Sequence, residues 1–417
     1  MASSSMKAAQ EAVKPLRVLL VSGEFPPMQG GVGDYTRELA RALVRLGHSV
    51  SVLTSVKGTW SEPGITTIPI MTSWGWQAWS QVTQTARQVK ADVVHTQYQT
   101  AAFGMHPAIN LLPLRQRFSS PRPLSVVTFH DLRVPYLFPK AGPVRRWVTH
   151  GLARWSDVAV VTNVEDSIEL AKARIPFHVI PIGSNISTAV PAGYDRAAWR
   201  KRLGLGPDDT LLSYFGFLNE SKGGETLIRA LWDLANQNRN VKLIMVGGQV
   251  GDSDRTNATY LERIKRLIDE LRLSDRILWT GFTSDAEVSA NLVASDMAVL
   301  PYRDGASYRR GSFMAALSHG LPIVSTKGPG TTPLSSVPNV TLDDSLPDLM
   351  DGDNVLLVPP DNPVVTSRAI IRLIASSALR QRLSISARVL AQAFDWDSIA
   401  RRTSNAYAAA LASSKKT

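Results

Sequence analysis

The sequence predicts an α/β protein with two successive, doubly wound domains, each built on a parallel sheet. Three observations support this fold class. The 417 residues exceed the roughly 100–200 residues that one compact core usually holds. Short apolar runs alternate with helical stretches, as βα units require. The alternation starts again after residue 200, so we expect a domain junction near Ile182–Ala198.

In the first half, short apolar runs predict the strands. The first is Val18–Val21, and a loop rich in Gly and Pro follows at residues 23–33. Apolar residues at helical spacing then predict a helix that ends at Gly47: Leu39, Ala42, Leu43 and Leu46. Further strands are expected at Val50–Leu53, Asp92–His95, Ser125–Phe129, Asp157–Thr162 and His178–Pro181.

In the second half, Leu211–Phe215 predicts a strand that runs into the glycine-containing loop Gly216–Gly224 and the helix Glu225–Ala235. Later strands are expected at Lys242–Val246, Ile277–Trp279, Met297–Leu300 and Ile323–Ser325. Later helices are expected near residues 258–272, 286–294, 312–319 and 364–392. Doubly wound sheets bind ligands at the carboxyl ends of their strands, so two such domains are expected to face a ligand cleft.

Composition excludes several classes of protein. The chain is 44% apolar and 19% charged, which is typical of folded domains and excludes a disordered or fibrous chain. Cysteine is absent, which excludes disulfides, thiolate metal sites and a cysteine nucleophile. No apolar run reaches the ~18 residues of a membrane span. Met1–Lys14 is polar and lacks a signal core, so we expect a frayed tail and a cytoplasmic location.

The positive charge is concentrated in the first half. Residues 1–200 hold 21 Lys and Arg against 12 Asp and Glu, a net +9, whereas residues 201–417 hold 25 against 23, a net +2. This asymmetry favours an anionic partner: a membrane surface, a polyanion or a phosphorylated substrate. Solubility alone is the simpler explanation. No nucleic-acid partner is expected, because the basic residues are spread over several helices and loops.

Three tryptophans gather within this basic half, at Trp74, Trp76 and Trp79. Tryptophan with nearby basic residues suits contact with a membrane or lipid, which we rank first. Burial in the core ranks second, and a stacking platform for a sugar ring is the third interpretation.

Gly30, Gly31 and Gly33 lie between a predicted strand and a predicted helix. Glycine lets the backbone approach a ligand closely, and the free amides of a helix N-terminus bind phosphate. The spacing differs from a dinucleotide fingerprint, which has a later glycine. A tight turn without a ligand is the alternative.

Two basic features in the second half suggest a site for a diphosphate. Lys222 follows a strand and a polar loop and precedes Gly223 and Gly224, so its ammonium group is expected to neutralise a diphosphate. Arg309 and Arg310 precede a predicted helix that begins near Gly311 and Ser312, where charge and helix dipole together attract an anion. The alternatives are an exposed lysine and a solvated basic turn.

His130, followed by Asp131, ends the strand Ser125–Phe129 and therefore lies at the carboxyl edge of the first sheet. This position favours a functional histidine. A hydrogen-bonded structural histidine is the alternative.

Five segments together resemble retaining glycosyltransferases of family 4, the group 1 type, which have the GT-B fold of two Rossmann-like domains. They are Gly23–Tyr35, Val126–Asp131, Tyr214–Leu227, Thr280–Leu317 and Phe394–Leu411. The resemblance extends from about Arg17 to Leu411. It implies an N-terminal acceptor-binding domain at 15–190, a C-terminal donor-binding domain at 198–392, and a helix at 395–412 that crosses back onto the first domain.

The resemblance also implies roles for single residues. The loop at Gly30 and Gly31 approaches the donor's distal phosphate and the acceptor, and His130 faces the transferred sugar. Lys222, beside Gly216, neutralises the donor diphosphate.

Further roles follow for the C-terminal half. The amides at Gly311 and Ser312 meet the same diphosphate, and the loop at Gly281 and Phe282 holds the base.

The sequence departs from the family pattern at two places. Phe217 stands where the family usually has an arginine, and we expect Arg309 or Arg310 to compensate. The two acids of the family's Glu-x7-Glu motif fall on Ser307 and Ala315. Asp304 can replace the first acid if three residues are inserted. Nothing replaces the second, which normally holds the ribose.

The resemblance implies transfer of a sugar from a nucleotide-diphosphate donor to a glycan or lipid-linked envelope acceptor, with retention of configuration. The nucleotide sugar is a co-substrate, and neither cofactor nor metal is expected. Asp252 and Asp254 lie in a polar loop and are read as solvated. Peripheral contact with the inner membrane face is expected. The departures leave two alternatives: a lipid-phosphate donor, or a catalytically weakened module that binds a sugar or nucleotide or serves as a partner subunit.

Overall fold

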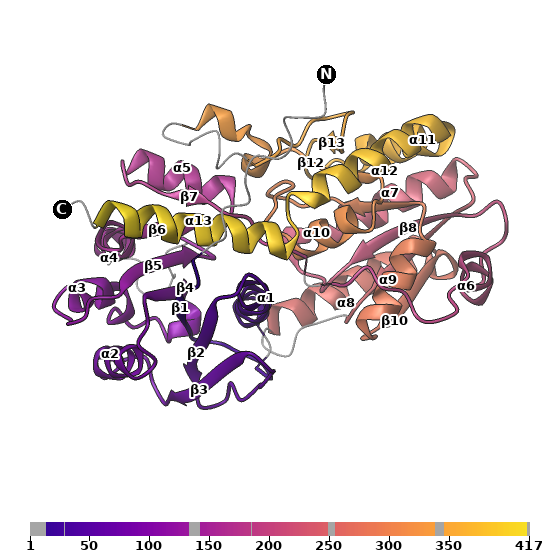
Figure 1. Cartoon of the computed structure of the whole chain (residues 1–417). Helices are drawn as coiled ribbons and strands as arrows, with labels where there is room; N and C mark the ends of the chain where they lie inside the picture. The colour runs from indigo at the N-terminus through magenta and orange to yellow at the C-terminus, as the bar shows by residue number, and fades with distance from the viewer. Residues whose placement is uncertain are drawn as a thin grey trace, which may run out of the picture. The chain divides into compact units, whose positions relative to one another are not determined.

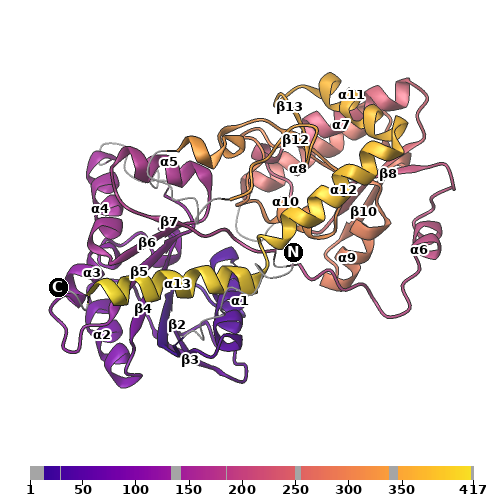
Figure 2. The same cartoon turned by 45° about the horizontal axis from the view of Figure 1, so that its top comes forward.

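The computed structural model describes residues 14–28, 30–132, 142–184, 186–248, 255–337 and 346–414. The chain divides into two compact units (Figures 1 and 2). The first unit holds Met1–Thr162, Asp166–Ile180 and Trp396–Thr417, and the second holds Asn163–Glu165 and Pro181–Asp395. The loop of Asp252 and Asp254, and the expected tail up to residue 13, lie outside the described residues.

The first unit contains a parallel sheet of seven strands in the order β3-β2-β1-β4-β5-β6-β7. The strands are β1 (Arg17–Ser22), β2 (Ser49–Ser55), β3 (Ile65–Met71), β4 (Val93–Tyr98), β5 (Leu124–Phe129), β6 (Val158–Val161) and β7 (His178–Val179). The order reverses between β1 and β4, which pair in parallel register with Ser22 opposite Gln97. A crevice for a ligand is expected at the carboxyl ends of these two strands.

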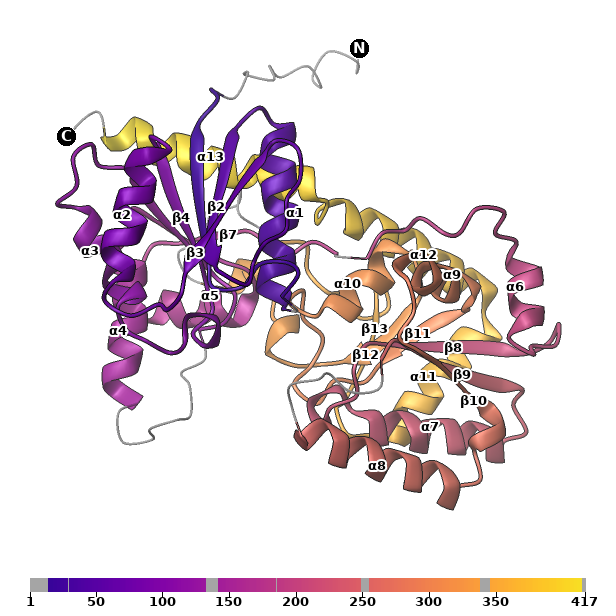
Figure 3. The ribbon, with the colours of Figure 1, turned by 90° about the horizontal axis from the view of Figure 1, so that it is seen from below.

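Central strands of this sheet are buried because helices cover both of its faces. Every residue of β4 and β5 is buried. The helices are α1 (Gly31–Arg45), α2 (Ala78–Gln88), α3 (Leu112–Gln116), α4 (Gly142–Trp155), α5 (Val164–Lys172) and α13 (Trp396–Ser414). Helices α1 and α13 pack together on one face, and α2, α3 and α4 lie on the other (Figure 3).

The sequence patterns did not predict β3 or α2. Strand β3 lies at the edge of the sheet and contains Thr66, Thr67 and Pro69, so it lacks the apolar run of a central strand. Helix α2 includes several polar residues, and only one side of it is buried. Both elements depend on packing against the rest of the sheet.

Helix α13 belongs to the first unit although it is last in the chain. Its Trp396 ring packs edge-on against Tyr35 of α1, with ring centroids 5.3 Å apart. Further along, the Tyr407 hydroxyl lies 2.6 Å from Nδ1 of the buried His95. An ion pair of 2.6 Å joins Asp397 to Arg45 at the surface. These contacts fix α13 across α1 and the sheet.

The second unit contains a parallel sheet of six strands in the order β10-β9-β8-β11-β12-β13. The strands are β8 (Thr210–Phe215), β9 (Val241–Val246), β10 (Ile277–Gly281), β11 (Met297–Leu300), β12 (Ile323–Thr326) and β13 (Leu356–Val358). Strand order reverses between β8 and β11, where Met297 pairs with Leu212. The carboxyl ends of β8 and β11 are therefore the expected ligand position of this unit.

Helices cover both faces of the second sheet as well. They are α6 (Arg196–Arg202), α7 (Gly224–Asn236), α8 (Arg255–Glu270), α9 (Asp285–Ala294), α10 (Gly311–Ser318), α11 (Pro363–Ala375) and α12 (Ser377–Gln392). The single helix predicted over residues 364–392 is wrong. Ser376 adopts an extended conformation and its side chain accepts a hydrogen bond from the Leu379 amide, so it ends α11 and begins α12.

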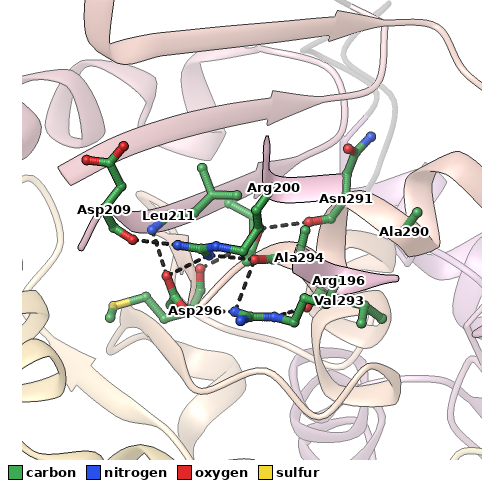
Figure 4. A network of polar contacts seen from close by, with 12 residues as sticks. Arg196, Arg200, Asp209, Leu211, Ala290, Asn291, Val293, Ala294 and Asp296 are labelled. Carbon is green, nitrogen blue, oxygen red and sulfur yellow. Dashed lines mark hydrogen bonds and ion pairs between the residues drawn. The ribbon is translucent and has the colours of Figure 1, made fainter. Parts of the chain in front are cut away.

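A polar network holds α6 at the amino end of this sheet (Figure 4). Asp296 binds both Arg196, at 2.8 Å, and Arg200, at 3.1 Å, and also accepts a hydrogen bond from the Leu211 amide. Both arginines donate to the Ala294 carbonyl as well. Because one carboxylate joins α6, β8 and β11, this network anchors the start of the second unit.

Candidate functional site

The predicted residues of the first unit follow the carboxyl ends of β1 and β5. Gly30 precedes α1, has no side-chain cap, and leaves the first amides of that 15-residue helix without intrahelical partners. A Cβ on Gly31 would meet nothing within 4 Å, so this backbone faces open space. The loop therefore has the exposed backbone that the sequence suggests.

A carboxylate that sequence reasoning missed lies against this loop. A Cβ on Gly30 would approach Glu24 Oε2 to 2.0 Å, so glycine is needed for Glu24 to sit there. Burial, and the nearby charge of Asp34, raise the pKa of Glu24. Its position directly after β1 was the available signal. Carboxylates near the start of α1 suit the hydroxyl groups of a sugar or polyol.

His130 lies one residue beyond β5, as predicted. Its Nε2 is 3.1 Å from the Gln97 side-chain oxygen at the end of β4. An oxygen can only accept here, so Nε2–H donates and Nδ1 is the unprotonated nitrogen. Burial lowers the pKa of His130 to about 3. The imidazole is therefore neutral at pH 7 and presents a hydrogen-bond acceptor.

Tyr35 connects the glycine loop to His130. It lies in the second turn of α1, and its ring is edge-on to His130 with centroids 4.6 Å apart. Tyr35 is fully buried, and its other neighbour is Trp396 of α13. The structure thus brings the start of α1 and the end of β5 together. No local pattern predicts this contact, because it joins residues that are 95 positions apart.

In the second unit, Lys222, Gly216 and Ser312 come together at the carboxyl ends of β8 and β11. Gly216 follows β8 with φ 103°, and a Cβ there would lie 3.0 Å from Lys222 Nζ and 4.0 Å from Ser312 Cβ. Ser312 is in the first turn of α10, the helix that follows β11. The ammonium group therefore lies beside a bare stretch of backbone and a helix N-terminus.

The loop that carries Lys222 is fixed to the end of β11. Lys222 ends a short 3₁₀ turn, and Gly223 follows with φ 69°. A Cβ on Gly223 would meet the Pro301 carbonyl oxygen at 1.8 Å, so only glycine allows this approach. The Arg303 amide donates to the Ser221 carbonyl at 2.9 Å. These contacts explain why glycine follows the lysine directly.

The surroundings of Lys222 change the pKa of its ammonium group. Burial, and the nearby charge of Arg310, lower its pKa to about 8. At pH 7 it remains mostly protonated but is poorly solvated. Such an ammonium group gains more than an exposed one when an anion binds, since its charge is not already compensated by water.

Asp304, Arg309 and Arg310 form one cluster. Asp304 binds Arg310 through both carboxylate oxygens, and Arg309 Nη2 lies 3.1 Å from Asp304 Oδ2. The Arg310 guanidinium also stacks over the Tyr302 ring, 5.0 Å from its centroid. Arg310 Nε is buried and, within the described residues, has no hydrogen-bond partner. Asp304 therefore holds the two arginines in this structure.

Helix α10 presents its N-terminus to this cluster. Arg310 precedes the helix without a side-chain cap, and Gly311 and Ser312 are its first residues. The Ser312 hydroxyl is 2.7 Å from the buried Tyr302 hydroxyl. The helix dipole and its free amides add to Lys222 and Arg310. Together these groups can bind a compact, multiply charged anion such as a diphosphate.

The departures from the family pattern have visible consequences. The Phe217 ring rests on the backbone after β9, since a Cβ on Gly248 would be 3.0 Å from Phe217 Cε1. Ser307 is 2% exposed and Ala315 is fully buried in α10, so neither supplies a carboxylate. Phe282 follows β10 and is 90% exposed, so its ring is available to a ligand.

The three tryptophans of the basic half occupy different environments. Trp74 is only 8% exposed and packs edge-on against Phe103, so it is a core residue and the membrane interpretation is wrong for it. Trp79 donates its indole N–H to the Ala108 carbonyl. Trp76 is 54% exposed. No helix in the described ranges is both long and apolar enough to span a bilayer.

Two family models match the chain. A model described as "Glycosyl transferase 4-like domain" matches residues 30–183, and one described as "Glycosyl transferases group 1" matches residues 195–389. The chain is 26% identical to a D-inositol 3-phosphate glycosyltransferase of Xylanimonas cellulosilytica, over 94% of this chain and 97% of that protein.

Other relatives agree with this assignment. A GDP-mannose-dependent α-(1-6)-phosphatidylinositol monomannoside mannosyltransferase of Mycolicibacterium smegmatis is 24% identical, over 81% of this chain and 86% of that protein. Anabaena Alr3699/HepE, solved in complex with UDP, shares the fold with a TM-score of 0.73 and 18% identity, over 94% of this chain and all of that one. The chain is a glycosyltransferase of the group 1 family and has the GT-B fold.

Proposed function

We propose that this glycosyltransferase moves a sugar from a nucleoside-diphosphate sugar to a lipid-linked or envelope acceptor, with retention of configuration and without a metal. The observation that carries the proposal is the cluster at the ends of β8 and β11. There the Lys222 ammonium lies beside Gly216, with Ser312 and Arg310 next to it. Cations and helix amides at one point suit a diphosphate.

The chemistry of this cluster matches a departing diphosphate. When the bond between the sugar and the diphosphate breaks, negative charge grows on the leaving oxygen. Lys222, the Arg309–Arg310 pair and the first amides of α10 would stabilise that charge. Asp304 would act through the two arginines it binds, as a positioning residue. No group of three or more His, Asp or Glu side chains suited to a metal occurs in the described part of the chain.

The first unit supports a hydroxyl-bearing acceptor. Glu24 and the Gly30 backbone lie at the end of β1, and neutral His130 lies two strands away, roughly 10 Å across the sheet. Such hydrogen-bond donors and acceptors can bind the hydroxyls of a sugar or polyol. The relatives named for inositol phosphate and phosphatidylinositol mannoside support an acceptor with a phosphate-bearing polyol.

A thermal-shift screen with nucleoside diphosphates and sugar nucleotides tests the donor. A ligand at 100 times its dissociation constant stabilises the folded chain by about 2.7 kcal/mol, which a melting curve resolves easily. We expect one nucleotide to raise the melting temperature with no metal added. A chelator at about 5 mM should leave this shift unchanged. The anomeric configuration of the product, read by NMR, tests retention.

The missing acids at Ser307 and Ala315 favour one alternative, a weakened module that binds a sugar or nucleotide or serves an active partner. The absence of nucleoside-diphosphate binding would favour this alternative. A screen in which no nucleoside diphosphate binds at millimolar concentration, beside a normal melt, would contradict a nucleotide donor. The search would then turn to lipid-phosphate sugars.

Peripheral membrane contact is part of the proposal and rests on the +9 first half and the exposed Trp76. It predicts that the protein sediments with anionic vesicles and that salt releases it. Equal sedimentation with neutral and anionic vesicles at low salt would contradict it.

A further inference from the structure

The first unit contains a cavity that includes none of the groups proposed above for sugar transfer. It measures about 1300 Å³, and its lining residues lie where β1, β2, β4 and β5 begin, at the end of α2 and in the C-terminal part of α13. Figure 3 shows these strands and helices. The Gly30 loop and His130 follow the opposite, carboxyl ends of the same strands. Six residues of strand β1 separate the two edges, a length of roughly 20 Å.

Basic side chains from three separate segments line this cavity. They are Lys14 and Arg17 before and at the start of β1, Arg87 and Lys90 at the end of α2, and Arg122 before β5. Arg17 is paired with Asp92 at 2.7 Å, and Arg122 with Asp157. Within the described residues, Lys14, Arg87 and Lys90 form no ion pair.

Compensation of a helix dipole explains only some of these cations. Arg87 and Lys90 lie where the α2 dipole is negative, so each has a structural explanation there. Lys14, Arg17 and Arg122 are on segments that flank strands and belong to no helix terminus. Asp92 and Asp157 compensate Arg17 and Arg122, so the positive charge at the cavity that has no ion-pair partner among the described residues is that of Lys14, Arg87 and Lys90.

Uncompensated hydrogen-bonding groups lie at the same place. Gln116 lines the cavity and is 2% exposed, and its side-chain nitrogen is buried without a partner in the described part of the chain. The Ser119 hydroxyl, three residues on, is likewise buried and unpartnered there. A buried donor without an acceptor is costly, and a bound acceptor would remove that cost.

Much of the remaining lining is apolar, with Leu16, Ala86, Pro121 and Leu411 among its residues. Polar side chains line the cavity as well: Ser49, Thr83, Asp92, Ser404 and Asn405. Its volume is larger than the roughly 300–1,000 Å³ of most small-molecule sites, so a bare phosphate ion would fill little of it. The cations can bind a phosphate group, and the apolar surface can contact the organic part of the same ligand. The shared chemistry is that of a phosphate ester with an apolar part.

We propose that this amino-edge cavity is a second ligand site that binds a phosphate ester, separate from the donor and acceptor positions. The phosphate lies among Lys14, Arg87 and Lys90, and the organic part contacts Leu16 and Leu411. The inference does not depend on the identity of the transferred sugar. The bound phosphate belongs either to a soluble ester or to a phospholipid headgroup, and the experiment below separates these two ligands.

The experiment measures binding calorimetrically to the full chain carrying Lys222→Ala, so that the diphosphate cluster does not contribute. The probes are inorganic phosphate, sn-glycerol 3-phosphate and monomeric dihexanoyl phosphatidylglycerol. The test variant is Arg87→Glu with Lys90→Glu. The control is Lys172→Glu with Arg174→Glu, which also ends a helix, changes the charge equally and includes a residue of similar positive φ, 53° against 51° for Lys90.

We expect at least one ester to bind. The test variant should lower its affinity by about tenfold or more, and the control variant should change the affinity by no more than about twofold. Gln116→Leu should weaken binding as well. Equal binding of both esters assigns a soluble ligand, and binding of the phospholipid alone assigns a lipid. Failure of every probe at low salt, or equal weakening by test and control variants with unchanged melting temperatures, would overturn the proposal.

Discussion

The Lys222 ammonium lies directly against the Gly216 backbone, so closely that a Cβ on Gly216 would be 3.0 Å from Lys222 Nζ. The contact joins the end of β8 to a loop six residues later in the chain. A backbone requirement, a glycine with φ 103°, is thereby linked to the position of a cation that we propose binds the donor diphosphate.

Gly216→Ala is therefore expected to weaken nucleoside-diphosphate binding by about tenfold, because the methyl group displaces the ammonium. It should also cost about 1 kcal/mol of stability, since alanine is strained at positive φ. Gly204→Ala is the matched control: Gly204 has φ 70° in the same unit, and a Cβ there meets nothing within 4 Å. Calorimetry that finds the same affinity for both variants would contradict the role of this contact.

Lys222→Ala should lower turnover by more than about tenfold, because the leaving diphosphate loses its nearest cation. The fold should survive, since burial disfavours the charged form of this lysine. Lys265→Ala removes an exposed lysine of the same unit and serves as the control. Turnover assays beside circular dichroism decide the matter, and wild-type turnover in Lys222→Ala would refute the assignment.

Binding of the diphosphate should depend on pH through Lys222. Its pKa is lowered to about 8 in the free protein, so above pH 8 the ligand must bind together with a proton. Affinity should then fall by up to about tenfold per pH unit above 8 and stay level below it. Lys222→Arg keeps its charge over this range and should show no such fall. Titrations at pH 7, 8 and 9 (about one unit apart) provide the comparison.

Asp304→Asn distinguishes two roles for this carboxylate. Asp304 holds Arg309 and Arg310 through ion pairs. If that is its role, the variant should weaken the binding of a nucleoside diphosphate and of its sugar nucleotide equally, by roughly three- to tenfold. If it faces the sugar, only the sugar nucleotide should lose affinity. We expect the first result, measured as two dissociation constants for each protein.

Acid should destabilise the first unit early. Burial lowers the pKa values of His95 and His130 to about 3, from 6.5 in a model peptide. Between these values the unfolded chain binds more protons than the folded one, so the free energy of unfolding falls as pH drops below 6.5. Urea midpoints between about pH 6.5 and 5, above the range of ordinary carboxyl groups, should show the loss. A variant with both histidines changed to glutamine should lose less over this interval, and an equal loss would show that other groups are responsible.

Parts of this protein were predictable because they are local. Apolar runs such as Val18–Val21 and Leu211–Phe215 mark strands that are buried on both faces. Glycines such as Gly216 and Gly223 mark turns whose positive φ favours glycine. The positions of Lys222 and of His130 follow from the same reasoning, since each comes just after a strand of a parallel sheet. Their catalytic and binding roles stay predictions until the experiments above are done.

Edge strands and helix breaks were less visible in the sequence. Strand β3 has a mixed composition because one side of it is not covered by another strand, and the break at Ser376 depends on a hydrogen bond to the Leu379 amide. Trp74 could not be assigned from its neighbours, since its burial depends on Phe103, which is distant in the chain.

By itself, the sequence determined the fold class, the two doubly wound sheets and the loops that carry the candidate groups, because these follow from periodicity and from glycine at fixed places. Only the tertiary structure decided which groups meet. Tyr35 reaches His130, Glu24 lies on Gly30, and Asp304 occupies both arginines. Distances and pKa values at these places depend on long-range packing and burial, which no local pattern of residues specifies.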